Sequence, residues 1–476
     1  MRRTVVVSLL WQGSASLVSQ VISWLATLVV IRLLSPGDYG LMAMAGLPIS
    51  LLMLIGDLGI GPAVVQASTL KRSQLVGLSS VALSAYVCGA LIAFASAPLA
   101  AAFFGEPMLV PVIRVLSLSF VFAGVYAVPQ ALVLRTLEFD RKAKIDVLAT
   151  LVSSIVALTL ALRGWGVWSL VAGVVVIHAI KAIAFQIVHP CLSLRLPSLA
   201  LVRDMVHFGG LVTLDRILWF GYSNLDVAIA GRALGGVLVG VYSVALSLAS
   251  IPIDKVMSIV TQVSFSAFSR TQNDRDAARR GMLEALAAVS LLAFPTFCGM
   301  ALVAPEALLV FVGPKWSDAV VPFQILCLLF PFRALSVLFP PALFGMGRPR
   351  VAVENNAITL VSVAVALIVG VQWGIIGLCV GWLVGYVPVF CMTAYRSLSS
   401  LDIPVKQAVG VMRLPVAATV AMSVGVLGAR IILAGIVSPV VELTGSILLG
   451  AGIYGAFMAA FRPQVLRSLW SEALGK

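Results

Sequence analysis

The stretch that decides the fold runs from Leu214 to Lys255: LDRILWFGYSNLDVAIAGRALGGVLVGVYSVALSLASIPIDK. It contains two long apolar runs that are joined by a glycine-rich turn, as in a hairpin. Six ionisable residues lie inside this apolar sequence: Asp215, Arg216, Asp226, Arg232, Asp254 and Lys255. Ionised groups are costly at membrane depth, so they usually face a partner or a water-filled cavity. The hairpin is therefore the first place to look for function.

The composition places the whole chain in a membrane. Of its 476 residues, 61% are hydrophobic and only 11% are charged, whereas soluble domains carry about 25% charged residues. The six cysteines and three histidines show no metal-ligand spacing, so we expect no metal site. No Walker A, Rossmann glycine or G-x-S-x-G pattern occurs. Neither an ATP-driven pump nor a hydrolase therefore finds support.

Fourteen segments are apolar over about the 20 residues that a spanning helix needs. They cover residues 9–33, 41–66, 75–103, 109–134, 145–162, 166–188, 204–231, 235–262, 282–304, 319–344, 353–371, 375–395, 409–433 and 436–461. The first follows Arg2 and Arg3 and is long enough to span, so we expect an uncleaved helix rather than a signal peptide.

Basic residues set the expected orientation, because Lys and Arg gather on the cytoplasmic side. With the N-terminus inside, inner segments hold 22 of the 32 Lys and Arg residues and outer segments hold five. We therefore expect both termini in the cytoplasm. The same asymmetry accounts for the net charge of +13 without a nucleic-acid partner.

Two motifs recur at nearly the same offset, which indicates an internal repeat. The sequence IRLL at 31–34, followed by Gly40, recurs as GRAL at 231–234, followed by Gly240. The sequence WGVWSLVAG at 165–173 recurs as WGIIGLCVG at 373–381. Six helices per repeat give both halves the same orientation, and a substrate path runs between parallel repeats of this kind.

The predicted architecture is all-α and integral to the membrane, with about 14 transmembrane helices. Residues 1–203 form an N-terminal lobe of helices 1–6, and residues 204–400 form a parallel C-terminal lobe of helices 7–12. Residues 401–476 add helices 13 and 14 and a cytoplasmic tail.

The segment 204–231 has a polar face. Asp215, Trp219, Tyr222 and Asp226 follow one another at helical spacing and so lie on one side of a helix. At a rise of about 1.5 Å per residue, the two carboxylates are about 16 Å apart along the axis. Aromatic rings between two acids suit either the faces of sugars or plain packing.

Ionised groups recur at a similar depth in the cytoplasmic half of the bilayer. Asp215-Arg216 and Asp254-Lys255 lie almost equally far from the hairpin turn, and Asp57 lies at the matching depth in the first half. These groups either line a cavity or neutralise one another as structural ion pairs, Asp215 with Lys255 and Arg216 with Asp254. The sequence leaves both alternatives open.

Three more cations lie within spans. Arg333 is mid-span between Pro331 and Pro340, with no acid in its own helix, which favours a substrate or cavity role. Arg114 lies near the outer end of its span and Lys181 near the inner end of its own. A long side chain at such a position also reaches the interface by snorkelling.

Several motifs carry a family resemblance. The opening WQGSASLVSQVISWLATLVVIRLLSPGDYGLMAM (11–44) and GDLGIGPAVVQ (56–66) resemble Wzx-type oligosaccharide flippases of the polysaccharide transporter family. In the second half, the matching stretches are LDVAIAGRALGGVLVGVYSVALSLASIPIDKV (225–256), FSAFSRTQND (265–274), FPTFCGMALVAPE (294–306) and GPKWSDAVVPFQIL (313–326). The resemblance covers most of residues 1–350 and weakens in helices 11–14.

The resemblance implies a member of the superfamily that also holds multidrug exporters (MATE) and the peptidoglycan-precursor flippase, known as MOP. It implies two six-helix lobes in a V around a central cavity, and a groove at helices 13 and 14 for a lipid tail. Such proteins flip undecaprenyl-pyrophosphate-linked oligosaccharides across the bacterial inner membrane for O-antigen, capsule or exopolysaccharide assembly. A polysaccharide polymerase and a chain-length regulator are the partners that it implies, besides the membrane lipids.

The resulting hypothesis is a lipid-linked oligosaccharide flippase that works by alternating access. A pyrophosphate that crosses a region of low dielectric needs cations, and the candidates are Arg216, Arg333, Lys255 and Arg114. The carboxylates expected to bind a coupling ion or to balance these cations are Asp57, Asp215, Asp226 and Asp254. We expect no cofactor beyond a coupling proton or sodium ion.

Two other classes of protein compete with this hypothesis. A MATE-type multidrug/cation antiporter on the same scaffold would have a cavity of net negative character, against which the inward Arg and Lys residues argue. A membrane polymerase or ligase that joins lipid-linked glycans generally needs a large outer loop. The longest outer connection here is Pro305–Asp318, so we do not expect an enzyme.

Overall fold

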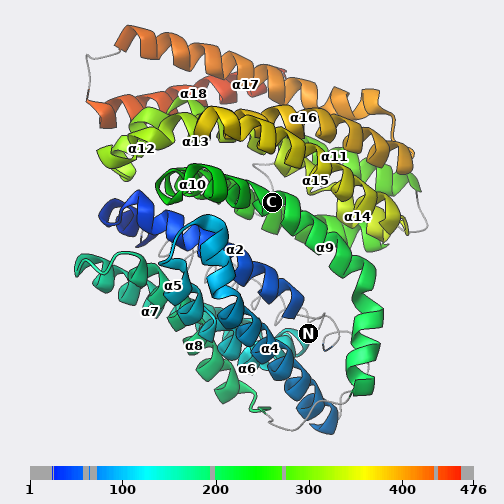
Figure 1. Ribbon diagram of the computed structural model, residues 1–476. Coiled ribbons are helices and arrows are strands. Elements are labelled where there is room, and N and C mark those ends of the chain that lie inside the picture. The colour runs from blue at the N-terminus through cyan, green and yellow to red at the C-terminus, as the bar shows by residue number, and fades with distance from the viewer. Residues whose placement is uncertain are drawn as a thin grey trace. The chain divides into compact units, whose positions relative to one another are not determined.

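The structure is a computed structural model that describes residues 24, 26–56, 64, 72–192, 199–270, 275–433 and 438–461 (Figure 1). Side chains are described for these residues except 72–74, 199–216, 254–270, 275, 277–278 and 433. Within this part of the chain, every regular element is a helix.

The helices follow one another with short connections. In chain order they are α2 (Pro36–Gly56), α4 (Arg72–Phe104), α5 (Leu109–Leu116), α6 (Leu118–Arg135), α7 (Phe139–Leu162), α8 (Val167–Val188), α9 (Leu199–Leu234), α10 (Gly236–Arg270), α11 (Arg275–Leu302), α12 (Ala304–Phe311), the 3-10 turn η1 (Pro314–Ala319), α13 (Val320–Ser336), α14 (Phe339–Gly345), α15 (Pro349–Gly370), the 3-10 turn η2 (Val371–Trp373), α16 (Gly374–Ser400), α17 (Val405–Leu433) and α18 (Pro439–Phe461).

Most of the described helices can cross a membrane. Eleven stretches of described residues are long and apolar enough to do so, and the longest, Pro349–Ser400, contains both α15 and α16. A helix pairs its backbone N–H and C=O groups by internal hydrogen bonds, because hydrocarbon offers them no partners. The predicted all-α, multi-pass membrane fold is confirmed. The count of fourteen stays a prediction, because the first expected span, 9–33, lies largely outside the described residues.

Two of the predicted spans are each divided between two helices. Residues 109–134 form α5 and α6, which are separated at Ser117, and residues 319–344 form α13 and α14. The second division has a cause in the sequence. Pro340 and Pro341 have no backbone N–H to donate to a preceding turn, so they fit the first turn of a new helix and not the middle of a long one.

The chain divides into two compact units, residues 1–240 and 241–476. In the first unit, α7 pairs with α8, α4 packs against α6, and α9 lies against α2. In the second, α15 pairs with α16, and α11 packs against α13 and α17. The helices α17 and α18, orange and red in Figure 1, pack against each other in the second unit. The predicted boundary between the two lobes, after residue 203, stays a prediction.

The helices α15 and α16 approach each other backbone to backbone. Gly377, Gly381 and Gly385 recur every four residues on α16 and so share one of its faces. A methyl group on Gly381 would lie 2.7 Å from the carbonyl oxygen of Ala366, and one on Gly385 would lie 2.6 Å from the Ala366 Cβ. Small residues allow this close approach in lipid, where packing rather than the hydrophobic effect joins helices.

This contact predicts a large penalty for one added methyl group. We expect Gly381→Ala to destabilise the protein by about 1–3 kcal/mol, because the methyl group forces α15 and α16 apart. The measurement is the midpoint of thermal unfolding in detergent. The control is Gly452→Ala on α18, where an added methyl group meets no atom within 4 Å and where alanine favours the helix by about 1 kcal/mol. Equal midpoints for the two variants would contradict the packing described.

Candidate functional site

Arg333 lies in the last turn of α13 and is partly buried. Its guanidinium carbon is 5.0 Å from the centre of the Trp382 ring on α16 and 5.7 Å from the centre of the Phe330 ring. A cation over the face of an aromatic ring is attracted by the negative charge of that face. These two ring contacts stabilise the guanidinium in its position on α13.

Hydrogen bonds fix the rings beneath Arg333. Trp382 is fully buried, and its indole N–H donates to the hydroxyl oxygen of Tyr242 on α10, over 2.8 Å. One turn further along α16, the hydroxyl of Tyr386 donates to Oγ of Ser336 on α13, also over 2.8 Å. Trp382 and Tyr386 are both buried, so their rings are fixed and are shielded from a ligand themselves.

An aromatic column continues along α16, formed by Trp382, Tyr386 and Phe390. The centres of consecutive rings are 6.2 Å and 6.5 Å apart, and Phe332 of α13 adds an edge contact to Phe390 at 5.7 Å. This column was not among the predicted site residues. Its signal was present, because the three residues recur every four positions and so share one helix face.

The other predicted residues with described side chains lie in the first unit. Arg114 is exposed on α5, and its guanidinium carbon is 4.7 Å from the centre of the exposed Phe94 ring. Asp226 is completely buried on α9, where its Oδ1 accepts a hydrogen bond of 2.8 Å from the backbone N–H of Val227. Tyr222, one turn away, is buried too, whereas Trp219 is half exposed.

The remaining predicted site residues cannot be placed in the same way. Asp57 lies outside the described residues, and the side chains of Asp215, Arg216, Asp254 and Lys255 are not described. Their two alternative roles, in a cavity or in structural ion pairs, stay predictions.

Lys181 of α8 belongs to a small ionic cluster. Its Nζ is 2.9 Å from Oδ1 of Asp146 on α7, and Nζ of Lys142 is 2.6 Å from the other oxygen of the same carboxylate. One turn before Lys181, Nδ1 of His178 is 3.0 Å from the hydroxyl oxygen of Tyr126. This cluster ties α6, α7 and α8 together. Its acid, Asp146, was not among the predicted site residues.

An apolar groove lies between α11, α17 and α18 in the second unit. Its volume is about 500 Å³, and Pro295, Gly299, Met422, Gly450 and Tyr454 are among the residues that line it. The hydroxyl of Tyr454 donates to the backbone oxygen of Leu291 over 2.8 Å, so this polar atom is already satisfied. The groove therefore offers hydrocarbon surface to a ligand.

An ionic clamp holds α12, α17 and α18 together at one end of the groove. Nη2 of Arg430 is 2.5 Å from Oε1 of Glu306, and its Nε is 3.4 Å from Oε1 of Glu442. Another N–H of Arg430 donates to the backbone oxygen of Leu302, which lines the groove. The clamp is mostly buried, so it fixes the position of the last two helices on the second unit.

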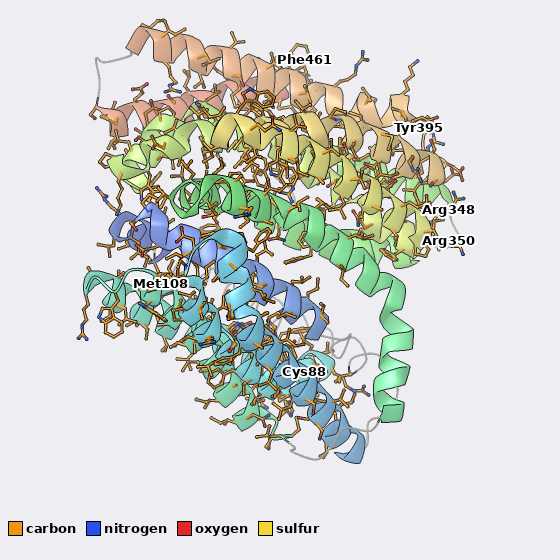
Figure 2. All side chains as sticks on the ribbon, in the orientation of Figure 1. Cys88, Met108, Arg348, Arg350, Tyr395 and Phe461 are labelled. Carbon is orange, nitrogen blue, oxygen red and sulfur yellow. The ribbon has the colours of Figure 1, made fainter. Side chains whose placement is uncertain are left out.

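Basic residues gather at one end of the second unit. Figure 2 shows Arg348 and Arg350, at the start of α15, at the same end as Tyr395 near the end of α16. Arg348 and Arg350 are exposed, and the neighbouring Arg396 forms an ion pair with Glu354. In the predicted topology, Arg348, Arg350 and Arg396 are among the 22 basic residues of the inner segments.

The fold resembles that of a solved flippase. The structure matches the lipid II flippase MurJ, in an inward closed conformation, over 96% of this chain and 99% of that chain, with a TM-score of 0.76. The sequences are only 12% identical, so this likeness shows the fold alone. The resemblance to the fold of this superfamily is confirmed, whereas the two six-helix lobes around a central cavity stay a prediction.

Two curated relatives are similar in sequence. WzxC from Escherichia coli (strain K12), a lipopolysaccharide biosynthesis protein, is 26% identical over 382 residues, which cover 78% of this chain and 76% of its own. ExoT from Rhizobium meliloti (strain 1021), a succinoglycan biosynthesis transport protein, is 27% identical over 325 residues, 68% of this chain and 65% of its own. Residues 29–321, more than half of the chain, match the family model described as polysaccharide biosynthesis protein. The predicted resemblance is thus confirmed, and the chain belongs to the polysaccharide biosynthesis protein family.

Proposed function

We propose that this protein is a flippase that carries a lipid-linked oligosaccharide across the bacterial inner membrane by alternating access. The observation that carries the proposal is a pair of features in the second unit. A partly buried arginine rests on an aromatic column, and an apolar groove of about 500 Å³ lies in the same unit. A polyprenyl diphosphate has the two complementary parts, an anionic headgroup and a hydrocarbon tail.

Arg333 is the proposed contact of the diphosphate. A guanidinium presents its N–H donors as a planar fork that matches phosphate oxygens, and a charge-assisted bond of this kind is about twice as strong as a neutral one. Trp382 stabilises the cation during the part of the cycle in which no substrate is bound. Arg216, Lys255 and Arg114 keep their predicted role as further cations for the headgroup.

The groove between α11, α17 and α18 is the proposed place for the lipid tail. Its described lining is nearly all hydrocarbon, so a polyprenyl chain loses nothing by leaving the bilayer for it. The Arg430 clamp keeps α17 and α18 against α12, which holds the groove in shape. The family relatives named above act in the biosynthesis or transport of polysaccharides, which supports a substrate that also carries sugars.

The remaining proposals concern location, coupling and partners. The exposed arginines at one end of the second unit (Figure 2) support cytoplasmic termini in the inner membrane. Of the four acids proposed to take a coupling proton or sodium ion, Asp226 has a described side chain, and it is completely buried. We propose a polysaccharide polymerase and a chain-length regulator as partners, and no organic cofactor.

Removal of the Arg333 charge tests the headgroup site. We expect Arg333→Ala to lower polymer export at least tenfold in a strain that lacks its own flippase, while the protein stays in the membrane. Arg333→Lys should retain part of the activity, because a lysine keeps the charge but not the fork. Polymer is measured at the cell surface, and protein by immunoblot of membranes.

The control for Arg333 is Arg396→Ala, which removes an exposed arginine that is paired with Glu354. This variant should export normally. Full export by Arg333→Ala would remove the headgroup assignment, and export of cationic dyes by the wild-type protein would favour the antiporter instead.

Filling the groove tests the place of the lipid tail. We expect Ala451→Trp to reduce export severalfold, because Ala451 lines the groove and an indole ring would occupy the tail's volume. The matched control is Gly452→Trp on the same helix, where the new side chain starts in open space. Export is again measured against protein level. Equal activity of the two variants would place the tail elsewhere.

A further inference from the structure

The first turns of α2 and α10 make a backbone contact that is reciprocal. A methyl group on Gly40 would overlap the carbonyl oxygen of Gly236, and a methyl group on Gly240 would overlap the carbonyl oxygen of Pro36. All of these residues belong to the first unit, and Gly40, Gly236 and Gly240 are buried. No side chain separates the two helices at this crossing.

The contact follows the internal repeat seen in the sequence. The two contacts are counterparts of each other, because the offset of 200 relates Gly40 to Gly240 and Pro36 to Gly236. Such an exchange is typical of an isologous interface around a two-fold axis. Counterparts should then meet near the axis itself. A methyl group on Gly37 would indeed lie 4.0 Å from Cγ2 of Val237.

The surroundings hold each first turn in shape. Oδ2 of Asp38 accepts hydrogen bonds from the backbone N–H and the hydroxyl of Ser35, over 3.0 Å and 2.6 Å, which fixes the start of α2. On the other side, a methyl group on Gly231 would lie 2.6 Å from the ring of Phe104. The start of α2 and the end of α9, which leads into α10, are therefore placed by contacts outside the crossing.

Glycine in a helix is unfavourable, so its presence at two equivalent positions calls for a reason. Close backbone contact supplies one. At the two glycines the contact is backbone against backbone, and the side chain of Val237 lies beside it. While it is closed, the contact is too tight to admit a ligand. Only the first residues of α10, Gly236–Gly240, belong to the first unit, so the crossing lies where the chain passes to the second.

We infer that the contact between residues 36–40 and 236–240 is the closing surface of the outer gate, the glycine gate. It is closed in this structure and must part before substrate leaves on the outer side. In the predicted topology, both first turns lie at the outer ends of their spans. The inference rests on the proposed function, and it adds the residues at which the pathway opens.

A reversible cross-link tests the inference. The variant Gly37→Cys/Val237→Cys is made in a chain whose six native cysteines are replaced, with a protease site inserted between residues 193 and 198. After oxidation, the two fragments should stay joined on a non-reducing gel. Export should fall at least tenfold and recover on reduction. Each single-cysteine variant should export polymer equally well with and without oxidant.

If the oxidised, cross-linked protein exported polymer as fast as the same protein after reduction of the disulfide, the gate assignment would be wrong. The proposed flippase function would remain intact. If neither this variant when reduced nor the wild-type protein exported polymer, the proposed function would fail first.

Single methyl groups give a second test. Gly40→Ala and Gly240→Ala should each reduce export severalfold, because the gate cannot close over a methyl group. Gly46→Ala on the same α2 helix should export normally, since an added methyl group there meets no atom within 4 Å. Wild-type export by both Gly40→Ala and Gly240→Ala, at equal protein level, would contradict the inference.

Discussion

The constraint on which this structure depends is that hydrocarbon offers no hydrogen bonds. Every backbone polar group inside the membrane must be satisfied within its own helix, and this is why each described regular element is helical. Lipid also removes the hydrophobic drive for helices to associate, so close packing has to replace it. Glycines provide that packing between α15 and α16, and again between the first turns of α2 and α10.

The same low dielectric decides what happens to charge. Lys181 is compensated by Asp146, and Arg430 by Glu306 and Glu442. Both arrangements tie helices together and use the cation's charge in doing so. Arg333 contacts the rings of Trp382 and Phe330, whose faces attract a cation. The positions of these residues along the sequence do not reveal which groups surround each cation.

Much of the fold could be predicted because hydropathy is local. The apolar segments 75–103, 145–162 and 375–395 each fall within a single helix, since a run of that length has one way to cross a bilayer. The division of residues 319–344 into α13 and α14 was missed, although Pro340 and Pro341 mark it. The apolar composition is continuous across the break, and hydropathy does not register a lost backbone donor.

The sequence by itself determined that the chain is helical, crosses a membrane repeatedly, belongs to its family and carries an internal repeat. Each of these properties depends on residue types at short or fixed spacings. Only the tertiary structure decided which rings lie beneath Arg333 and that Gly40 meets Gly236. Trp382 is 49 residues from Arg333, and Gly236 is 196 residues from Gly40. Contacts over such separations depend on how whole helices pack, and no local pattern of residues encodes them.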